Sequence, residues 1–249
     1  EREISARLLV GADGNRSAVR EALGIAISEH DYQQTLFVAR MRTEQAPDGT
    51  AYERFGEHGP TALLPRGDRH FGVVHGVATA EAEAVAALDD AAWIERIQGV
   101  FGWRVGRFLS TGERSTYPII KLVAERMTAD RAVVVGNAAQ SLHPIGAQGF
   151  NLGLRDALTL AELIEHADDP GAASLLDAYA QRRSEDRQRT LQFSDGLARI
   201  TGNASPLLRP LRSVGLLAAD TSGALQSMLV GGAMGFRGDV PALCREAGR

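Results

Sequence analysis

Two segments of the chain combine small and polar residues in an order that could hold a ligand. The first, residues 10–20, reads Val-Gly-Ala-Asp-Gly-Asn-Arg-Ser-Ala-Val-Arg. Its Gly14 can adopt a positive φ, and Asp13 follows an apolar run, at the edge where the strands of open α/β sheets meet their ligands. The alternative interpretation is an ordinary turn followed by Ser17 as a helix cap.

The second segment, residues 135–156, is longer and more specific. Small residues follow an apolar run, Pro144 stiffens the loop, and Gly146 and Gly149 lead into a helix. Small residues let a ligand approach the backbone, and the amide groups at a helix start suit an anionic group. The alternative is a glycine-rich connection with ordinary caps. Because strand, rigid loop, glycines and helix occur together in this order, we predict a cofactor site.

Short apolar runs precede both segments and predict the strands that position them. Residues 6–12 and 131–136 have the pattern of buried strands that end in turns. Because each run leads into a loop and a helix, we predict an α/β sheet covered on both faces. Long helices are expected at 149–166 and 172–193, and the second, which carries several Arg and Glu residues, is expected to be the more exposed.

The part of the chain between these strands has a different pattern. From residue 33 to 123, alternating polar and apolar residues are interrupted by Gly and Pro, which predicts antiparallel strands of a separate sheet. Residues 80–101 have the spacing of an amphipathic helix. The expected strands cover 35–42, 62–64, 70–77 and 106–110.

Composition and charge exclude several classes of protein. The 249 residues include 27 Lys and Arg against 31 Asp and Glu, a net charge of −4. Such a chain does not drive counterion release, so nucleic-acid binding is excluded as its main role. The single cysteine, Cys244, excludes a disulfide-stapled fold and favours the cytoplasm. No membrane span or signal peptide is expected, and the histidines other than His143 show no paired spacing, so no metal site is predicted.

Together, the two segments resemble the internal fingerprints of the class A flavoprotein aromatic hydroxylases. The first fingerprint, D-G-x-x-S-x-V-R, is matched at Asp13, Gly14, Ser17, Val19 and Arg20. The second, G-D-A-A-H-x-x-x-P-x-x-G-x-G-x-N, is matched at Gly136, Ala138, Ala139, Pro144, Gly149 and Asn151.

Departures from the second fingerprint are informative. Asn137 stands where the family usually has the Asp that binds the ribityl chain, so it keeps an acceptor but loses the charge. Gln140 stands where the family usually has His. The variant G-N-A-A-Q-S-L-H-P-I resembles the ubiquinone-biosynthesis branch of the family, in which a small residue then Gly usually precedes Gln148, where this chain has Gly146 then Ala147.

The resemblance implies FAD as cofactor, NAD(P)H as reductant and oxygen transfer to the ring of a prenylated phenol. By the resemblance, the amides of Gly149 and Phe150 face the anionic end of the flavin, Pro144 lines the reactive side of the ring, and Asn151 bonds its pyrimidine edge. His143 is the candidate catalytic base, because a phenol must lose a proton. The full set of expected cofactor-binding residues is Asp13, Gly14, Arg20, Gly136, Asn137, Ala138, Pro144, Gly146, Gly149, Phe150 and Asn151.

The family's G-x-G-x-x-G turn, which binds the ADP half of FAD, does not occur in this sequence, and residue 1 is Glu. We therefore expect an N-terminally truncated fragment that lacks roughly 100 to 150 residues and is inactive alone. The predicted fold class is α/β (α+β), a partial Rossmann-like FAD-binding domain with an inserted antiparallel-sheet substrate domain and a helical C-terminal tail. The expected divisions are 1–32 and 124–195 for the FAD-binding domain, 33–123 for the substrate domain and 196–249 for the tail.

Apolar residues suggest where a prenylated substrate and a membrane could make contact. Candidates for the substrate side, each of which could instead be a core residue, are Phe37, Tyr52, Phe55, Leu64, Phe71 and Tyr117. The tail carries apolar residues in weak helical spacing with Arg199, Arg209 and Arg212 nearby, which favours peripheral contact with the inner membrane. Closing the core is the alternative role for the tail.

Two other functions stay open. The chain could be a flavin-free binding or assembly module that partners the enzymes of a quinone pathway, which the missing dinucleotide turn favours. It could also be a hydroxylase of the same fold that acts on a non-prenylated aromatic compound.

Overall fold

The computed structural model describes residues 3–56, 58–201, 215, 217, 220–233 and 239–245. The chain divides into two compact units. The first unit comprises Glu1–His30, Ile120–Leu197 and Ser213–Arg249, and the second comprises Asp31–Ile119 and Ala198–Arg212. A mixed α/β architecture with a large antiparallel sheet confirms the predicted fold class.

A small sheet forms the centre of the first unit. Strand β1 (Leu9–Gly11) pairs in parallel with β9 (Ala132–Val134), and β8 (Thr128–Ala129) pairs with β9 on the other side. The strands predicted before both ligand segments are therefore present but shorter. The expectation that the first is buried was wrong, because β1 has a single neighbour and leaves the side chain of Leu9 47% exposed.

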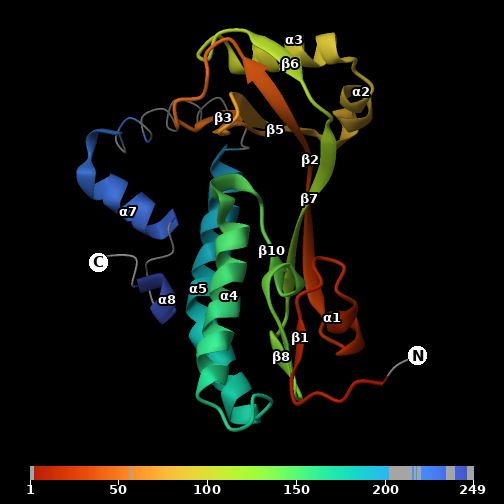
Figure 1. Cartoon of the computed structure of the whole chain (residues 1–249), viewed down its shortest axis with the longest axis vertical. Helices are drawn as coiled ribbons and strands as arrows, with labels where there is room; N and C mark the ends of the chain where they lie inside the picture. The colour runs from red at the N-terminus through yellow and green to blue at the C-terminus, as the bar shows by residue number, and fades with distance from the viewer. Residues whose placement is uncertain are drawn as a thin grey trace. The chain divides into compact units, whose positions relative to one another are not determined.

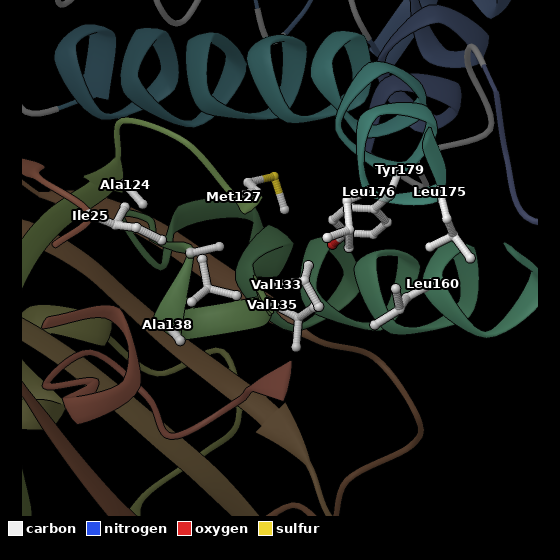
Figure 2. Packing of buried hydrophobic residues seen from close by; sticks show 12 residues of the cluster. Ile25, Ala124, Met127, Val133, Val135, Ala138, Leu160, Leu175, Leu176 and Tyr179 are labelled. Atoms are coloured by element: carbon white, nitrogen blue, oxygen red, sulfur yellow. The ribbon is translucent and has the colours of Figure 1, made fainter. Parts of the chain in front are cut away.

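Two long helices pack beside this sheet. Figure 1 shows α4 (Gln148–Glu165) and α5 (Ala173–Thr201) lying side by side. Val133 and Val135 meet Leu160 of α4 and Leu176 and Tyr179 of α5 in one buried cluster (Figure 2). The smaller helices of the unit are α1 (Ala18–Ala22), α7 (Gly223–Ala233) and α8 (Ala242–Arg245).

Helix α5 has a larger share of exposed residues than α4, as its charges suggested, but part of its charge is buried. Arg183 and Tyr179 are fully buried, and Asp186 is 7% exposed. These charged side chains are buried because opposite charges on α4 and α5 neutralise one another inside the unit.

The second unit contains most of the large antiparallel sheet. Its strands include β2 (Ile27–Thr43), β3 (Tyr52–Gly56), β4 (Gly59–Pro65), β5 (His70–Ala78), β6 (Phe108–Thr111) and β7 (Ser115–Ala124). The pairing order is β10-β7-β2-β5-β4-β3, where β10 is Gln140–Ser141, and β6 pairs with β2. Of these, β3, β7 and β10 were not among the expected strands.

Helices cover one face of this sheet, and a break divides the amphipathic segment that was expected to be continuous. The segment forms a short turn, η1 (Thr79–Glu81), then α2 (Ala82–Ala86) and α3 (Asp90–Phe101). Asp89 has an extended backbone (φ −70°, ψ 174°), and its carboxylate accepts a hydrogen bond from the amide of Ala92. Asp89 therefore caps α3, while α2 ends at Ala86 with Ala87 as its C-cap.

The substrate-side candidates are divided between the two roles considered for them. Phe37 and Phe71 belong to the core cluster that packs against Trp93 of α3, and Tyr52 lies at its edge. Leu64 and Tyr117 are 47% and 56% exposed, so they remain available to a ligand. Alternation along each strand explains this division, because neighbouring residues point to opposite faces.

His75 is a buried, neutral part of this core. Its Nδ1 lies 2.8 Å from Thr61 Oγ1, and its Nε2 accepts a hydrogen bond from Arg96 Nε at 3.1 Å. Burial, reinforced by the charge of Arg96, lowers the pKa of His75 to about 4. The native state therefore holds this proton less tightly than the unfolded chain, in which the pKa is about 6.5.

We predict that His75 makes the chain less stable as the pH falls from about 6.5 to 4, because the unfolded state then binds the extra proton. The contribution reaches about 3 kcal/mol at pH 4. Urea denaturation at several pH values should show a shallower loss of stability for His75→Gln, whose amide can keep both hydrogen bonds. Identical pH dependence in the two proteins would contradict this assignment.

Candidate cofactor site

The turn after β1 is organised by Asp13. Its carboxylate accepts hydrogen bonds from Ser17 Oγ and from the amide of Val19 at 3.2 Å. These two bonds lower the pKa of Asp13, which is exposed and ionised. Gly14 has φ +85°, and Ser17 caps α1 by accepting from the amide of Arg20 at 2.9 Å. The predicted helix start at Ser17 is confirmed.

Arg20 joins the two ligand segments. The side chain is buried, and Nη1 donates to the carbonyl of Ala138 at 2.9 Å while Nη2 donates to that of Asn15 at 2.8 Å. Both contacts are to backbone, so Arg20 sets the distance between the β1 turn and the loop that follows β9.

The loop after β9 approaches α4 closely at two glycines. Gly136 begins the turn η2 (Gly136–Ala138) with φ +57°. A Cβ placed on Gly153 of α4 would lie 3.0 Å from the Cα of Gly136, so a larger residue at position 153 would push the turn and the helix apart by a few tenths of an ångström. The sequence analysis did not single out Gly153, although it recurs four residues after Gly149 on the same helix.

Left-handed backbone leads into α4. Gly146 and Ala147, in the turn η3 (Ile145–Ala147), have φ of +76° and +51°, so the chain places an alanine in a conformation that favours glycine. Ala147 is the N-cap residue of α4 and makes no side-chain capping bond. Amides in the first turn of a helix have no partner within that helix, and the aligned dipoles favour a negative group there.

Several residues expected to touch the cofactor lie on the exposed side of this loop, whereas Ala138 is fully buried in the core and was wrongly expected to touch it. Asn137, Pro144 and Gly146 are exposed, and the ring of Phe150 is 78% exposed. A Cβ on Gly149 would meet no atom within 4 Å. An open face with a polar Asn137, small residues and an uncapped start of an 18-residue helix fits the ribityl chain and the pyrimidine end of a flavin.

His143 has a different position from these residues. It is 3% exposed, its Nδ1 accepts from the amide of Ile145 at 3.2 Å, and its carbonyl accepts from Ser194 Oγ at 3.0 Å. Burial lowers the pKa of His143 to about 4, although Asp195 opposes the shift. The neutral ring holds the loop, and this environment favours a structural role over the proton transfer considered for it.

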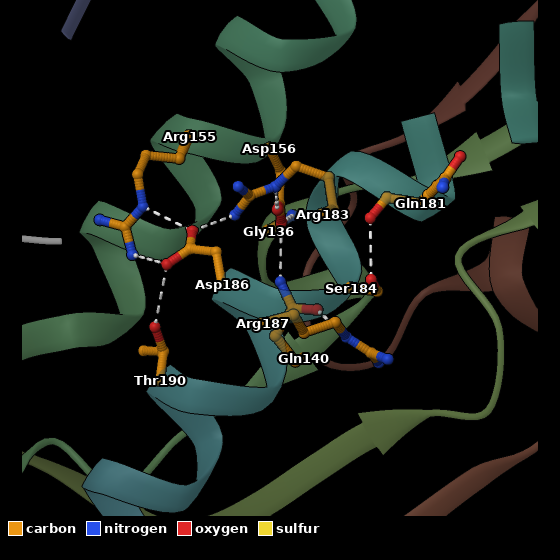
Figure 3. Close-up of polar contacts among 10 residues, drawn as sticks. All are labelled: Gly136, Gln140, Arg155, Asp156, Gln181, Arg183, Ser184, Asp186, Arg187 and Thr190. Atoms are coloured by element: carbon orange, nitrogen blue, oxygen red, sulfur yellow. Dashed lines mark hydrogen bonds and ion pairs between the residues drawn. The ribbon is translucent and has the colours of Figure 1, made fainter. Parts of the chain in front are cut away.

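A buried network of charged side chains on α4 and α5 contacts the loop that follows β9 (Figure 3). Asp156 of α4 accepts from the amide of Gly136 at 3.1 Å, from Gln140 Nε2 at 2.7 Å and from Arg183 Nε at 2.8 Å. Arg187 of α5 donates to Gln140 Oε1 at 2.8 Å. Asp156 therefore links the cofactor loop to both long helices.

A second carboxylate completes the network. Asp186 accepts from Arg155 Nε and from Arg183 Nη2, each at 2.7 Å. The sequence analysis missed these residues as a group. The available signal was the Arg-Asp pair 155–156 inside the second segment together with charges at 183, 186 and 187, which lie on one face of a helix.

The predictions about a metal site, the C-terminal tail and a membrane span concern residues outside this loop. Within the described ranges, no group of three or more His, Cys, Asp or Glu side chains is arranged to hold a metal ion. Arg209 and Arg212 of the tail lie outside the described residues. Across the ranges that are described, no helix has the length and hydropathy to cross a bilayer.

The ion pair between Asp156 and Arg183 gives a stability prediction. Arg183→Met should lower the free energy of unfolding by about 3 to 5 kcal/mol, because it removes the cation that pairs with the buried Asp156, whereas Asp156→Asn should cost less, because Arg183 keeps its ion pair with Asp186. The double variant should lose less than the sum of the two. Urea denaturation measures all three.

A surface pair provides the matched control. Arg131 and Asp169 also form a hydrogen-bonded ion pair, but both side chains are 43% exposed. Asp169→Asn should cost much less than Arg183→Met, because water screens an exposed ion pair. Equal losses at the buried and the exposed pair, or strict additivity at the buried pair, would contradict the role of burial.

The sequence of the chain is similar to those of known proteins. The chain is 34% identical over 236 residues to ubiquinone hydroxylase UbiL of Rhodospirillum rubrum, and the alignment covers 93% of this chain and 55% of that protein. It is 36% identical over 183 residues to ubiquinone hydroxylase UbiM of Neisseria meningitidis, covering 72% of this chain and 40% of the relative. The chain therefore spans about half the length of the curated relatives it matches.

Solved structures share the fold. The Diels-Alderase PyrE3 of pyrroindomycin biosynthesis matches with a TM-score of 0.73 at 24% identity, over 94% of this chain and 51% of that one. HpxO of Klebsiella pneumoniae, solved with FAD and uric acid, matches with a TM-score of 0.70 at 18% identity, over 93% and 60%. A family model described as an FAD binding domain matches residues 1–194, which include both ligand segments. The chain belongs to the FAD-binding-domain family.

Proposed function

We propose that the chain forms part of an FAD-dependent monooxygenase that hydroxylates the ring of a prenylated phenol in ubiquinone biosynthesis, with NAD(P)H and oxygen as co-substrates. The observation that carries the proposal is the uncapped start of α4, at Gly149 and the exposed Phe150, together with the exposed Asn137 in the turn after β9. The relatives named as ubiquinone hydroxylases support the choice of reaction.

The loop residues have separate roles in this proposal. Asn137 bonds a ribityl hydroxyl, the amides of Gly149 and Phe150 face the anionic pyrimidine end, and Asn151 bonds its edge. Pro144, exposed on the loop, lines the flavin ring. A bound FAD would supply the redox chemistry, in which two electrons from NAD(P)H let O2 give one oxygen atom to the substrate ring and the other to water.

Supporting residues act through the backbone. Arg20 and Asp13 hold the β1 turn, and Asp156 fixes the amide of Gly136. Gly14 and Gly146 let the backbone approach the cofactor. We propose His143 as a positioning residue of the loop, because its ring is buried and its Nδ1 is engaged.

The substrate and the membrane involve other surfaces. We propose that exposed apolar residues of the second unit, Leu64 and Tyr117 among them, receive the prenylated ring. Peripheral contact with the inner membrane is assigned to the C-terminal region, in which Leu225 and Val230 of α7 are 37% and 53% exposed. Association with other enzymes of the quinone pathway would use the same region.

The test is the visible absorbance of bound flavin. The chain and a version extended at its N-terminus by a dinucleotide-binding segment are each incubated with excess FAD and freed of unbound cofactor. We expect flavin absorbance near roughly 450 nm in the extended protein. Absence of bound flavin from both proteins would contradict the proposal and favour a flavin-free binding module.

Asn137 provides a finer version of this test. Asn137→Leu in the extended protein should weaken FAD binding about tenfold, because one hydrogen bond to a ribityl hydroxyl is lost. Gln181→Leu, at an exposed amide of α5, is the matched control and should leave the affinity unchanged. Fluorescence titration of FAD measures both, and equal affinities for the two variants would remove Asn137 from the site.

A further inference from the structure

Arginines gather on the face of the second unit's sheet opposite the one that the described helices α2 and α3 cover. Arg40 and Arg42 alternate along β2 with Ala39 and Met41, which belong to the core on the helix-covered face. The register places Arg42 opposite His70 and Arg40 opposite Gly72 of β5. Both arginines are exposed and therefore project from the opposite face.

A third arginine lies over the same strands. A Cβ placed on Gly72 would lie 3.6 Å from Cδ of Arg66, so the stem of Arg66 crosses the strand at the position opposite Arg40. Arg69 follows in the turn between β4 and β5, with φ +66°. We refer to Arg40, Arg42, Arg66 and Arg69 as the arginine cluster.

The positive charge of the arginine cluster exceeds the negative charge of the side chains that pair with it. Asp68 forms an ion pair and hydrogen bond with Arg40. Within the part of the chain that the structure describes, Arg42, Arg66 and Arg69 have no side-chain hydrogen bond or ion pair. Partial burial and then the charges of Arg40 and Arg42 lower the pKa of His70, which indicates a positive field at this surface.

Fold stability does not explain this arrangement. Like charges on neighbouring strands repel one another, and no carboxylate compensates three of the four arginines. The chain as a whole has a net charge of −4, so the cluster is a local reversal of its charge. A long polyanion would meet repulsion beyond the cluster, whereas a compact anion would meet only the arginines.

We propose that the arginine cluster is a binding site for a phosphate group. The planar guanidinium donates paired hydrogen bonds that match two oxygens of a phosphate, and several such groups on one surface can share a single anion. The phosphate can belong to a phospholipid headgroup or to a soluble dinucleotide. Leu64, which is 47% exposed and stands opposite Gly72 on β4, provides an apolar neighbour for the first source.

The experiment uses the chain without flavin, so its result is independent of the proposed monooxygenase activity. One arm measures sedimentation with vesicles of phosphatidylglycerol and phosphatidylcholine in equal parts, against vesicles of phosphatidylcholine alone. The other arm measures binding of NADPH and of inorganic pyrophosphate by calorimetry. We expect binding in at least one arm that weakens as salt is added, because the contacts are ionic.

Matched variants locate the site. Arg42→Gln/Arg66→Gln should weaken binding about tenfold or more, because two cationic groups are lost. Arg126→Gln/Arg189→Gln removes the same charge from the first unit and should leave binding unchanged. Circular dichroism and melting temperatures confirm that both double variants fold.

The outcomes distinguish the sources. Binding to the anionic vesicles alone identifies a lipid headgroup, and binding of NADPH or pyrophosphate alone identifies a soluble phosphate ligand; either result supports the site. No binding in both arms, or equal weakening in the two double variants, would overturn the proposal.

Discussion

One carboxylate, Asp156, holds the candidate site together. It is fully buried, and its oxygens accept from the amide of Gly136, from Gln140 and from Arg183. An isolated carboxylate would be costly inside a protein, so the three donors are a condition for its burial. Through these bonds, Asp156 fixes the turn at Gly136, the side chain of Gln140 and helix α5 relative to one another.

In the candidate site, the residues that hold the loop in place differ from the residues that are exposed to a ligand. Asp156, Arg20 and His143 are buried and engage backbone groups of the loop, while Asn137, Gly146 and Phe150 remain exposed on its outer side. Preorganisation of this kind reduces the entropy that ligand binding must overcome. We therefore propose that the exposed ring of Phe150 and the uncapped start of α4 form the binding surface, on a loop whose conformation the buried residues fix.

Sequence patterns predicted the parts of this arrangement that depend on local chemistry. The Ser17 cap, the glycine positions and the start of α4 follow from residue type and spacing alone. The buried face of α5 was not predictable in this way, because Arg183 is polar in the sequence and becomes compatible with burial only beside Asp156 and Asp186. The break before α3 could have been predicted from Asp89, whereas the burial of Phe37 required knowing which sheet face the helices cover.

We propose that the loop from Gly136 to Asn151 holds the flavin end of FAD. Amide hydrogen exchange of the N-terminally extended protein, with and without FAD, tests it most directly. The account predicts that FAD slows exchange at the amides of Gly149 and Phe150 and in the turn at Gly136, because the cofactor accepts hydrogen bonds from the former and covers the latter. Unchanged exchange throughout this loop in a protein that has bound FAD would contradict the account.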